Sequence, residues 1–304
     1  LRPRTAQEVT MSEQMNRMRD GAGFIAALDQ SGGSTPRALE AYGIGPEAWS
    51  TDEEMFDLVH AMRTRVMTSP AFTSERILAA ILFERTLDST VEGRPTADYL
   101  WDVKGVVPFL KVDKGLEAEA HGARLMKPIP DLDATLAKAA GAHVFGTKMR
   151  SVILHADTAG VRSVVDQQFE IADRILDAGL TPIIEPEVDI HASDKTGIEL
   201  LLLSSLTAHL DDLRPGRDVI LKLTIPSVTD FYSGLMRHPR VARIAALSGG
   251  YSREEADRRL ARNHGLIASF SRALLEGLDA GQTREEFDAT LAASIDSIYR
   301  ASTT

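Results

Sequence analysis

Short apolar segments alternate with longer amphipathic segments along most of this chain. Each apolar segment has the length of a buried strand, and the segment after it is usually long enough for a helix. We therefore predict eight strands, at residues 23–30, 77–84, 105–113, 143–150, 181–188, 218–225, 241–248 and 266–272.

The amphipathic segments predict helices between these strands. Residues 161–176 carry apolar side chains at the i, i+3, i+4 spacing, and Gly179 suits the position just after a helix end. Similar spacing predicts helices near 52–67, 195–213, 252–264 and 284–299. Strands that alternate with helices imply parallel βαβ units, and eight units favour an α/β fold of one domain, a closed (β/α)8 TIM barrel. An open doubly wound sheet is the alternative, but the first turn lacks the GxGxxG pattern of a dinucleotide fold.

The two ends of the chain do not follow this pattern. Residues 1–10 stop just before Met11, and we interpret them as an N-terminal extension or leader that is disordered. The barrel is then expected to span residues 11–304. The last eight residues, SIYRASTT, resemble a fraying end.

Composition excludes several classes of protein. The chain has 304 residues, with 34 Lys and Arg against 44 Asp and Glu, a formal net charge of −10. A general nucleic-acid binder would instead show a basic patch. The absence of cysteine excludes disulfides, thiolate metal sites and a cysteine nucleophile. No apolar run approaches the roughly 20 residues that cross a bilayer, and no signal peptide is visible. We expect a cytoplasmic protein that binds neither nucleic acid nor membranes.

Charged residues lie at the predicted strand ends. Within 219–225 the odd-numbered residues form one apolar face, so Lys222, on the other face, is expected to point into the barrel. Charges at the C-terminal ends of barrel strands are where such enzymes place catalytic groups. A single charge there is usually solvated or ion-paired, whereas eight on one rim indicate a site. The eight are Asp29, Lys111, Asp113, Lys148, Arg150, Glu185, Glu187 and Lys222.

This set suits chemistry through a lysine imine. A lysine amine attacks carbonyls only when unprotonated, and both burial and a neighbouring cation favour that form. Lys222 meets both conditions, because Lys148 and Arg150 are expected two strands away. A protonated imine can accept the electrons of a breaking C–C bond, and nearby carboxylates can move the protons. In isolation, Lys222 would be interpreted as a lysine reaching solvent from a strand end.

Two Gly/Ser clusters predict phosphate sites. Ser248–Gly249–Gly250 follows the seventh strand, where barrels often bind phosphate, and Arg272 ends the eighth strand. Residues 31–34, Ser-Gly-Gly-Ser, follow Asp29. Two clusters on one rim with lysines between them favour a substrate that carries two phosphates. The eight histidines show no HxH or HxxxH pair, so no metal site is predicted.

As a set, these motifs resemble class I fructose-1,6-bisphosphate aldolase, in its bacterial single-domain form. The resemblance covers roughly residues 12–300, with the motifs in the family order. It implies reversible cleavage of fructose 1,6-bisphosphate to dihydroxyacetone phosphate and glyceraldehyde 3-phosphate, without metal or cofactor. The matching stretches are GFIAALDQSGGS, ILFE, GVVPFLKVDKG, FGTKMRS, PIIEPE, VILKLTIP, LSGGYS and SFSRAL.

The resemblance also implies a role for each residue of the rim. Lys222 would form the imine, with Glu185 as the main acid and base, assisted by Glu187. Asp29 would take the substrate hydroxyl proton during cleavage, and Lys148 would activate the lysine and stabilise intermediates. The implied contacts are Ser248, Gly249 and Arg272 to the first phosphate, and Ser31, Ser34, Lys111 and Arg150 toward the second.

The sequence departs from the animal members of this family at three places. Gln30 stands where they have Glu, and Ser271 stands where they have Gly. They also carry a C-terminal catalytic Tyr, and Tyr299 does not match its position, so another group or water must move that proton. The alternatives are another imine-forming barrel enzyme of transaldolase-like type, or a non-catalytic sugar-phosphate-binding or adhesive barrel. The oligomeric state is left open, with a homo-oligomer as one option.

Overall fold

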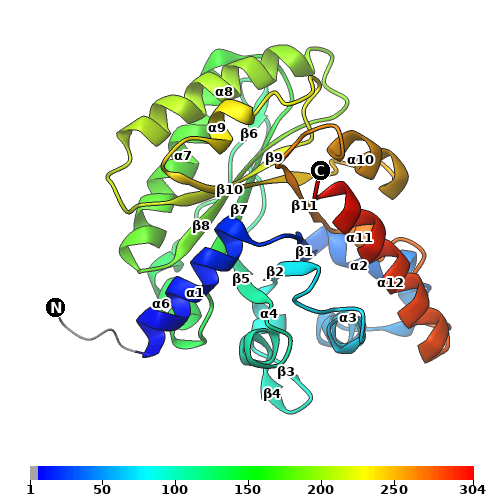
Figure 1. Ribbon diagram of the computed structural model, residues 1–304. Coiled ribbons are helices and arrows are strands. Elements are labelled where there is room, and N and C mark those ends of the chain that lie inside the picture. Colours follow the sequence, from blue (N-terminus) through cyan, green and yellow to red (C-terminus); the bar gives the residue numbers. More distant parts are fainter. Residues whose placement is uncertain (1–5) are drawn as a thin grey trace.

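The computed structural model describes residues 6–304 and shows a closed barrel of parallel strands surrounded by helices (Figure 1). Within these residues eight parallel strands pair in the order β5-β2-β1-β11-β10-β9-β8-β7, and β7 pairs with β5 to close the ring. The predicted (β/α)8 barrel is thus confirmed. Its strands are β1 (Phe24–Leu28), β2 (Ile77–Leu82), β5 (Val107–Lys111), β7 (Gly146–Ile153), β8 (Thr181–Val188), β9 (Val219–Thr224), β10 (Val241–Leu247) and β11 (Ile267–Phe270).

Seven of these strands lie inside their predicted ranges. The exception is β7, which begins and ends three residues later than predicted. Three two-residue strands were not predicted, because such short segments leave no alternating pattern. They are the hairpin of β3 (Thr90–Val91) with β4 (Arg94–Pro95), and β6 (Ala123–Arg124), which pairs antiparallel with β7.

The five predicted helices are present. They are α3 (Asp52–Thr68), α7 (Thr158–Asp177), α8 (Lys195–Asp212), α10 (Arg253–Leu260) and α12 (Arg284–Ala301). Capping boxes begin two of them, from Thr51 with Glu54 and from Thr283 with Glu286. The prediction for α10 ran four residues too far, because the Asn263 side chain donates to the Arg259 carbonyl at 2.9 Å and ends the helix.

The other helical segments connect strands or close the barrel. The helices are α1 (Ala6–Asp20), α2 (Thr35–Ala41), α4 (Glu84–Leu87), α5 (Thr96–Asp98), α6 (Leu132–Gly141), α9 (Ser233–Met236) and α11 (Arg272–Leu275). Short 3₁₀ turns occur at Gly32–Ser34 and Pro46–Ala48, and a π-helical turn occurs at Tyr99–Val103.

Helix α1 corrects the expectation for the N-terminus. Residues 6–10 begin this helix, so the prediction that they are disordered is wrong, while residues 1–5 lie outside the described part of the chain. Met18 is fully buried among the side chains that fill the barrel, and Arg17 donates to the Ile77 carbonyl at 3.3 Å. The helix therefore packs at the N-terminal end of the strands (Figure 1).

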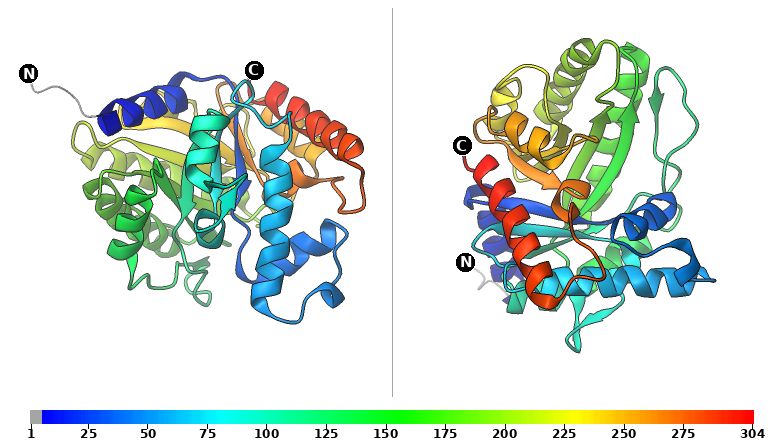
Figure 2. Two further views of the ribbon diagram at one scale, coloured as in Figure 1. Left: turned by 90° about the horizontal axis from the view of Figure 1, so that it is seen from below. Right: turned by 90° about the vertical axis from the view of Figure 1, so that its right-hand side faces the viewer.

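The C-terminus is fixed rather than frayed. The Ala268 N–H donates to Ser302 Oγ at 3.0 Å, and the Gly265 N–H donates to the Thr304 carbonyl at 3.2 Å. Helix α12, red in Figure 2, packs beside β11 and α10. The Tyr299 ring lies 5.5 Å from Cζ of Arg76, just before β2, so it sits at the opposite end of the barrel from Lys222.

Alternation along the strands separates two cores. On β9, Val219, Leu221 and Leu223 belong to the core between barrel and helices, while Ile220 belongs to the core inside the barrel. This confirms the predicted faces of β9 and makes Lys222 point inward. No helix in the described residues combines the length and apolar character needed to span a bilayer.

Candidate active site

Four charged side chains meet inside the barrel near the C-terminal ends of its strands. Lys222, Glu185 and Lys148 come from β9, β8 and β7, and Asp29 follows β1. The register places Ile183 beside Ile220, so Glu185 lies level with Lys222, two residues further along. Their exposed fractions are 4% for Lys222, 3% for Glu185, 2% for Lys148 and 8% for Asp29.

Glu185 bridges the two lysines. Its Oε1 lies 3.0 Å from Lys222 Nζ, and its Oε2 lies 3.1 Å from Lys148 Nζ. Lys148 Nζ also contacts Asp29 Oδ2 at 2.6 Å. Burying a charge is costly unless it is paired, and here each cation has at least one carboxylate within contact distance.

A third acid, Asp113, extends the cluster. Asp113 Oδ2 lies 4.0 Å from Lys148 Nζ, and Asp113 Oδ1 lies 2.7 Å from Lys111 Nζ. Three lysines thus alternate with three carboxylates around the inner rim. This balance keeps the net charge near zero and allows the cluster to be buried.

Electrostatics favour ionised forms in this cluster. Burial alone would raise the pKa of Asp29, but Lys148 and Lys222 hold it well below its usual range. The same two lysines outweigh burial and lower the pKa of Glu185. Burial opposes the charge on Lys148, but Asp29 and Glu185 raise its pKa well above the usual value. Lys148 is therefore a fixed cation.

The arrangement differs from the sequence hypothesis in one respect. Lys148 and Arg150 were expected to act on Lys222 as neighbouring cations. Glu185 instead lies between Lys222 and Lys148, and Arg150 Nε is ion-paired with Glu187. The charged partner in contact with Lys222 is thus a carboxylate rather than a second cation.

Two neutral side chains that the site interpretation did not include bond the backbone of β8, one at Glu185 and one at Val188. The Glu185 N–H donates to Oε1 of Gln168, a fully buried residue of α7, at 2.8 Å. Thr224 Oγ1 accepts from the Val188 N–H and donates to the Val188 carbonyl, both at 2.8 Å. Gln168 lies on the apolar face of the predicted helix 161–176, and a polar residue on such a face was the available signal.

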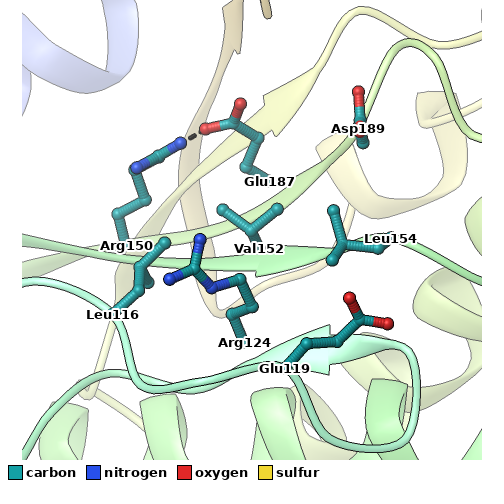
Figure 3. Close-up of a pocket in the computed structure, with 8 residues that line it drawn as sticks. All are labelled: Leu116, Glu119, Arg124, Arg150, Val152, Leu154, Glu187 and Asp189. Carbon is teal, nitrogen blue, oxygen red and sulfur yellow. Dashed lines mark hydrogen bonds and ion pairs between the residues drawn. The ribbon is translucent and has the colours of Figure 1, made fainter.

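A cavity of about 480 Å³ opens beside the Arg150–Glu187 pair (Figure 3). The Arg150 side chain is 38% exposed, so guanidinium donors remain available to a ligand. Arg124, on the short strand β6, reaches into the same cavity and was missed because a two-residue strand gives no pattern. The lining residues are Leu116, Glu119, Arg124, Arg150, Val152, Leu154, Glu187 and Asp189.

The loop after β10 and the end of β11 come together. Gly249 has φ +63°, and a Cβ there would lie 2.5 Å from Ile190 Cγ2, so glycine is required. A Cβ on Gly250 would lie 3.5 Å from Arg272 Nη2. The Ser248–Gly250 turn and the Arg272 guanidinium therefore share one place on the rim, as a phosphate site needs.

The other predicted cluster follows Asp29. Ser31 is half-buried just after β1, and Gly32–Ser34 form a tight turn. The Ser34 side chain lies outside what the structure describes. Lys111 ends β5, which is separated from β1 by β2, so Ser31 and Lys111 lie on one arc of the rim.

In the part of the chain that the structure describes, no group of three or more His, Asp or Glu side chains has an arrangement that could hold a metal ion.

Comparison with known proteins gives three close relatives, each named class 1 fructose-bisphosphate aldolase. The Synechocystis protein is 59% identical over 292 residues, covering 96% of this chain and 97% of the relative. The Porphyromonas gingivalis protein is 57% identical over 290 residues, covering 95% and 98%. The Clostridium acetobutylicum protein is 58% identical over 291 residues, covering 96% and 99%. No protein-family model matches the chain.

Solved structures support the fold alone. A Plasmodium falciparum fructose-bisphosphate aldolase, in complex with TRAP and an inhibitor, gives a TM-score of 0.76 at 20% identity, covering 99% of this chain and 96% of that one. A Corynebacterium glutamicum protein gives 0.54 at 13% identity, covering 97% and 92%.

Proposed function

Because this chain belongs to the class 1 fructose-bisphosphate aldolases, we propose that it cleaves fructose 1,6-bisphosphate through an imine on Lys222. The products are dihydroxyacetone phosphate and glyceraldehyde 3-phosphate, and the reaction is reversible. Membership of this family makes the chain an aldehyde-lyase. The observation that carries the proposal is the buried contact of 3.0 Å between Lys222 Nζ and Glu185 Oε1.

Imine formation uses this contact. Lys222 passes a proton from its ammonium group to Glu185, and the free amine attacks the ketone carbon of the substrate. A second amine proton moves to the former carbonyl oxygen. Glu185 returns its proton to that oxygen, which leaves as water, and the imine nitrogen keeps one proton and the positive charge. The lowered pKa of Glu185 means that the resting enzyme presents it as the base this step requires.

Cleavage then uses Asp29. Its carboxylate takes the proton of the C4 hydroxyl, the C3–C4 bond breaks, and the electron pair moves to the imine nitrogen. Glyceraldehyde 3-phosphate leaves as the aldehyde. A proton then adds to C3 of the enamine on Lys222, and water hydrolyses the resulting imine, which frees dihydroxyacetone phosphate. Asp29 is ionised because its pKa is held well below the usual range, and Lys148, 2.6 Å away, stabilises the charge that moves during cleavage.

The two phosphates are assigned to opposite parts of the rim. Ser248, Gly249 and Arg272 receive the phosphate on the dihydroxyacetone half, supported by the position of Arg272 beside the glycine turn. The second phosphate is assigned to Arg150, Lys111, Ser31 and Ser34. Because Arg150 and Lys111 are already ion-paired, they bind it with their remaining N–H donors.

Relatives named class 1 support cytoplasmic chemistry without metal or cofactor. A cleavage assay with fructose 1,6-bisphosphate in EDTA tests this. Glyceraldehyde 3-phosphate is expected at the EDTA-free rate. Fructose 1-phosphate should be cleaved more slowly, to dihydroxyacetone phosphate and unphosphorylated glyceraldehyde. Activity that EDTA abolishes and a divalent cation restores would contradict metal independence. Release of glyceraldehyde 3-phosphate only when an acceptor aldehyde takes up the three-carbon ketose unit, with no free dihydroxyacetone phosphate, would favour the transaldolase-like alternative. Binding without turnover would favour the non-catalytic one.

A further inference from the structure

Two residues that depart from the animal pattern contact each other on the rim, where they follow the neighbouring strands β1 and β11. Gln30 Nε2 donates to Ser271 Oγ at 2.6 Å, although the residues are 241 positions apart. Main-chain pairing between β1 and β11 covers only Ile25 with Ser269 and Ala26 with Phe270. The side-chain bond therefore joins the two chain segments beyond the point where the strands pair.

Ser271 makes this bond instead of capping a helix. It stands at the N-cap of α11, where a serine normally accepts from the backbone of the first turn. Its side chain makes no such cap and accepts from Gln30 instead. Because Ser271 directly precedes Arg272, this bond sets the start of the segment that carries the arginine.

Gln30 also accepts hydrogen bonds from a buried cation. Arg63 of α3 is 1% exposed and donates to the Gln30 carbonyl at 2.6 Å and to Gln30 Oε1 at 3.3 Å. Its other terminal nitrogen donates to Thr86 Oγ1 at 2.6 Å. Arginine only donates, so Oε1 must face Arg63, which leaves Nε2 to face Ser271. The orientation of the Gln30 amide is thereby fixed.

The same residue adjoins the catalytic cluster. Gln30 directly follows Asp29, which contacts Lys148 at 2.6 Å. Burial lowers the pKa of Arg63 to about 10, and Asp29 partly opposes this shift, so Arg63 stays protonated at neutral pH. A rigid chain of donors thus runs from Arg63 through Gln30 to Ser271, with Asp29 and Arg272 next to it in sequence.

We propose that Gln30 and Ser271 act as a linked pair of positioning residues for the phosphate group that Arg272 binds. The inference rests on the proposed function, which assigns Arg272 to that phosphate. It adds that the guanidinium is placed by a side-chain bond from the segment just after β1. This bond keeps a fixed separation between the phosphate site and Asp29.

A double-mutant cycle on phosphate-dependent binding tests the link. The variants are Gln30→Met, Ser271→Ala and both together, because methionine keeps the size of glutamine without a donor. The readout is the concentration of dihydroxyacetone phosphate that gives half-maximal borohydride trapping. Each single variant is expected to raise it about fivefold, the usual effect of one lost hydrogen bond. The double variant should also raise this concentration about fivefold, because both changes break the same bond. For phosphate-free dihydroxyacetone, the half-maximal concentration should change less than twofold in every variant.

Two further variants separate positioning from general damage. Ser271→Thr keeps the hydroxyl and should restore wild-type binding. Gln282→Met removes a comparable bond, from Gln282 Nε2 to Thr290 Oγ1 at 3.2 Å in the loop before α12, and should leave binding unchanged. If Gln30→Met does not fold, the contrast of Ser271→Ala with Ser271→Thr decides alone.

Three results would overturn the link. In the first, the half-maximal concentration rises about 25-fold in the double variant, the product of the two single effects. In the others, binding of phosphate-free dihydroxyacetone weakens equally, or Ser271→Thr does not restore wild-type binding. Each can occur with a fully active wild type, and then the proposed function stands without the inference. A wild type that forms no imine with dihydroxyacetone phosphate would overturn the proposed function and this inference together.

Discussion

Glu185 Oε1 lies 3.0 Å from Lys222 Nζ inside a barrel where both side chains are almost completely buried. A buried ammonium group can lose its proton only to an acceptor it contacts, and Glu185 is that acceptor. Glu185→Gln keeps the shape and the hydrogen bond but cannot take a proton. We expect kcat for fructose 1,6-bisphosphate to fall about 10²–10⁴-fold.

Steady-state cleavage kinetics check this, with Glu187→Gln as the comparison. Because Glu187 pairs with Arg150 rather than with Lys222, its amide variant should lose less activity. A Glu185→Gln enzyme within tenfold of wild type, or a larger loss in Glu187→Gln, would contradict the assignment of Glu185.

Lys148 couples stability to pH. In the wild type, Asp29 and Glu185 have lowered pKa values, so their contribution to stability is present above about pH 4–5 and is lost as pH falls toward the folded-state values. Lys148→Met leaves these carboxylates without their shared cation. The free energy of unfolding at pH 7 should fall by about 3–5 kcal/mol.

The sign of the pH dependence should also change in this variant. Without Lys148, burial dominates and raises the pKa of Asp29, so acidification relieves the destabilisation instead of adding to it. Urea unfolding at pH 7, 5 and 4 measures this. Equal pH slopes for Lys148→Met and wild type would show that Lys148 does not set these pKa values.

A second buried ion pair holds the loop after β9. Lys195 is ion-paired with the fully buried Glu199 and donates to the Ile225 carbonyl at 2.8 Å, while both Glu199 oxygens accept from the Ser227 N–H at 3.1 Å. Glu199→Ala should lower the free energy of unfolding by about 3–5 kcal/mol, because it leaves a buried cation unpaired.

Replacing both partners should lower the free energy of unfolding much less than replacing Glu199 alone. The double variant Lys195→Met with Glu199→Leu substitutes apolar groups for the pair, so its free energy of unfolding should lie well above that of Glu199→Ala. Urea denaturation of the two variants provides the comparison. A double variant less stable than Glu199→Ala would mean that the two residues are not a coupled pair.

Two glycines offer a matched test of packing. A Cβ on Gly146, in β7, would overlap the Thr181 carbonyl and lie 2.6 Å from Phe109 Cε1. Gly141, at the end of α6, has open space around the same position. Gly146→Ala should therefore cost more than about 3 kcal/mol or prevent folding, while Gly141→Ala should be neutral or stabilising by up to about 1 kcal/mol. Thermal melting ranks them, and similar melting temperatures would contradict the tight β7–β8 approach.

Sequence periodicity predicted the barrel well, because strand length and face alternation are local properties. Lys222 could be placed inside from its own strand alone. The bond from Gln30 to Ser271 could not be predicted, since it depends on how the segments after two strands, 241 residues apart in the sequence, meet. The pairing of Lys222 with Glu185 also required the register, which decides which carboxylate is level with the amine.

Some features that were not predicted could have been recognised from the sequence. Gln168 and Arg63 are polar residues on the buried faces of α7 and α3, and both serve the rim. Helix α1 was not predicted: residues 6–10 were assigned to the N-terminal extension, and no helix was expected around Met18, which is buried inside the barrel. Polar residues on apolar helix faces therefore show where helices support a site.

Borohydride trapping with dihydroxyacetone phosphate tests the central claim most directly. Reduction should fix the ligand on Lys222, and because trypsin does not cut at a modified lysine, the adduct should appear in the peptide of residues 218–237. Lys222→Met should give no adduct and no cleavage. An adduct on any other peptide, or cleavage that persists in Lys222→Met, would contradict the account.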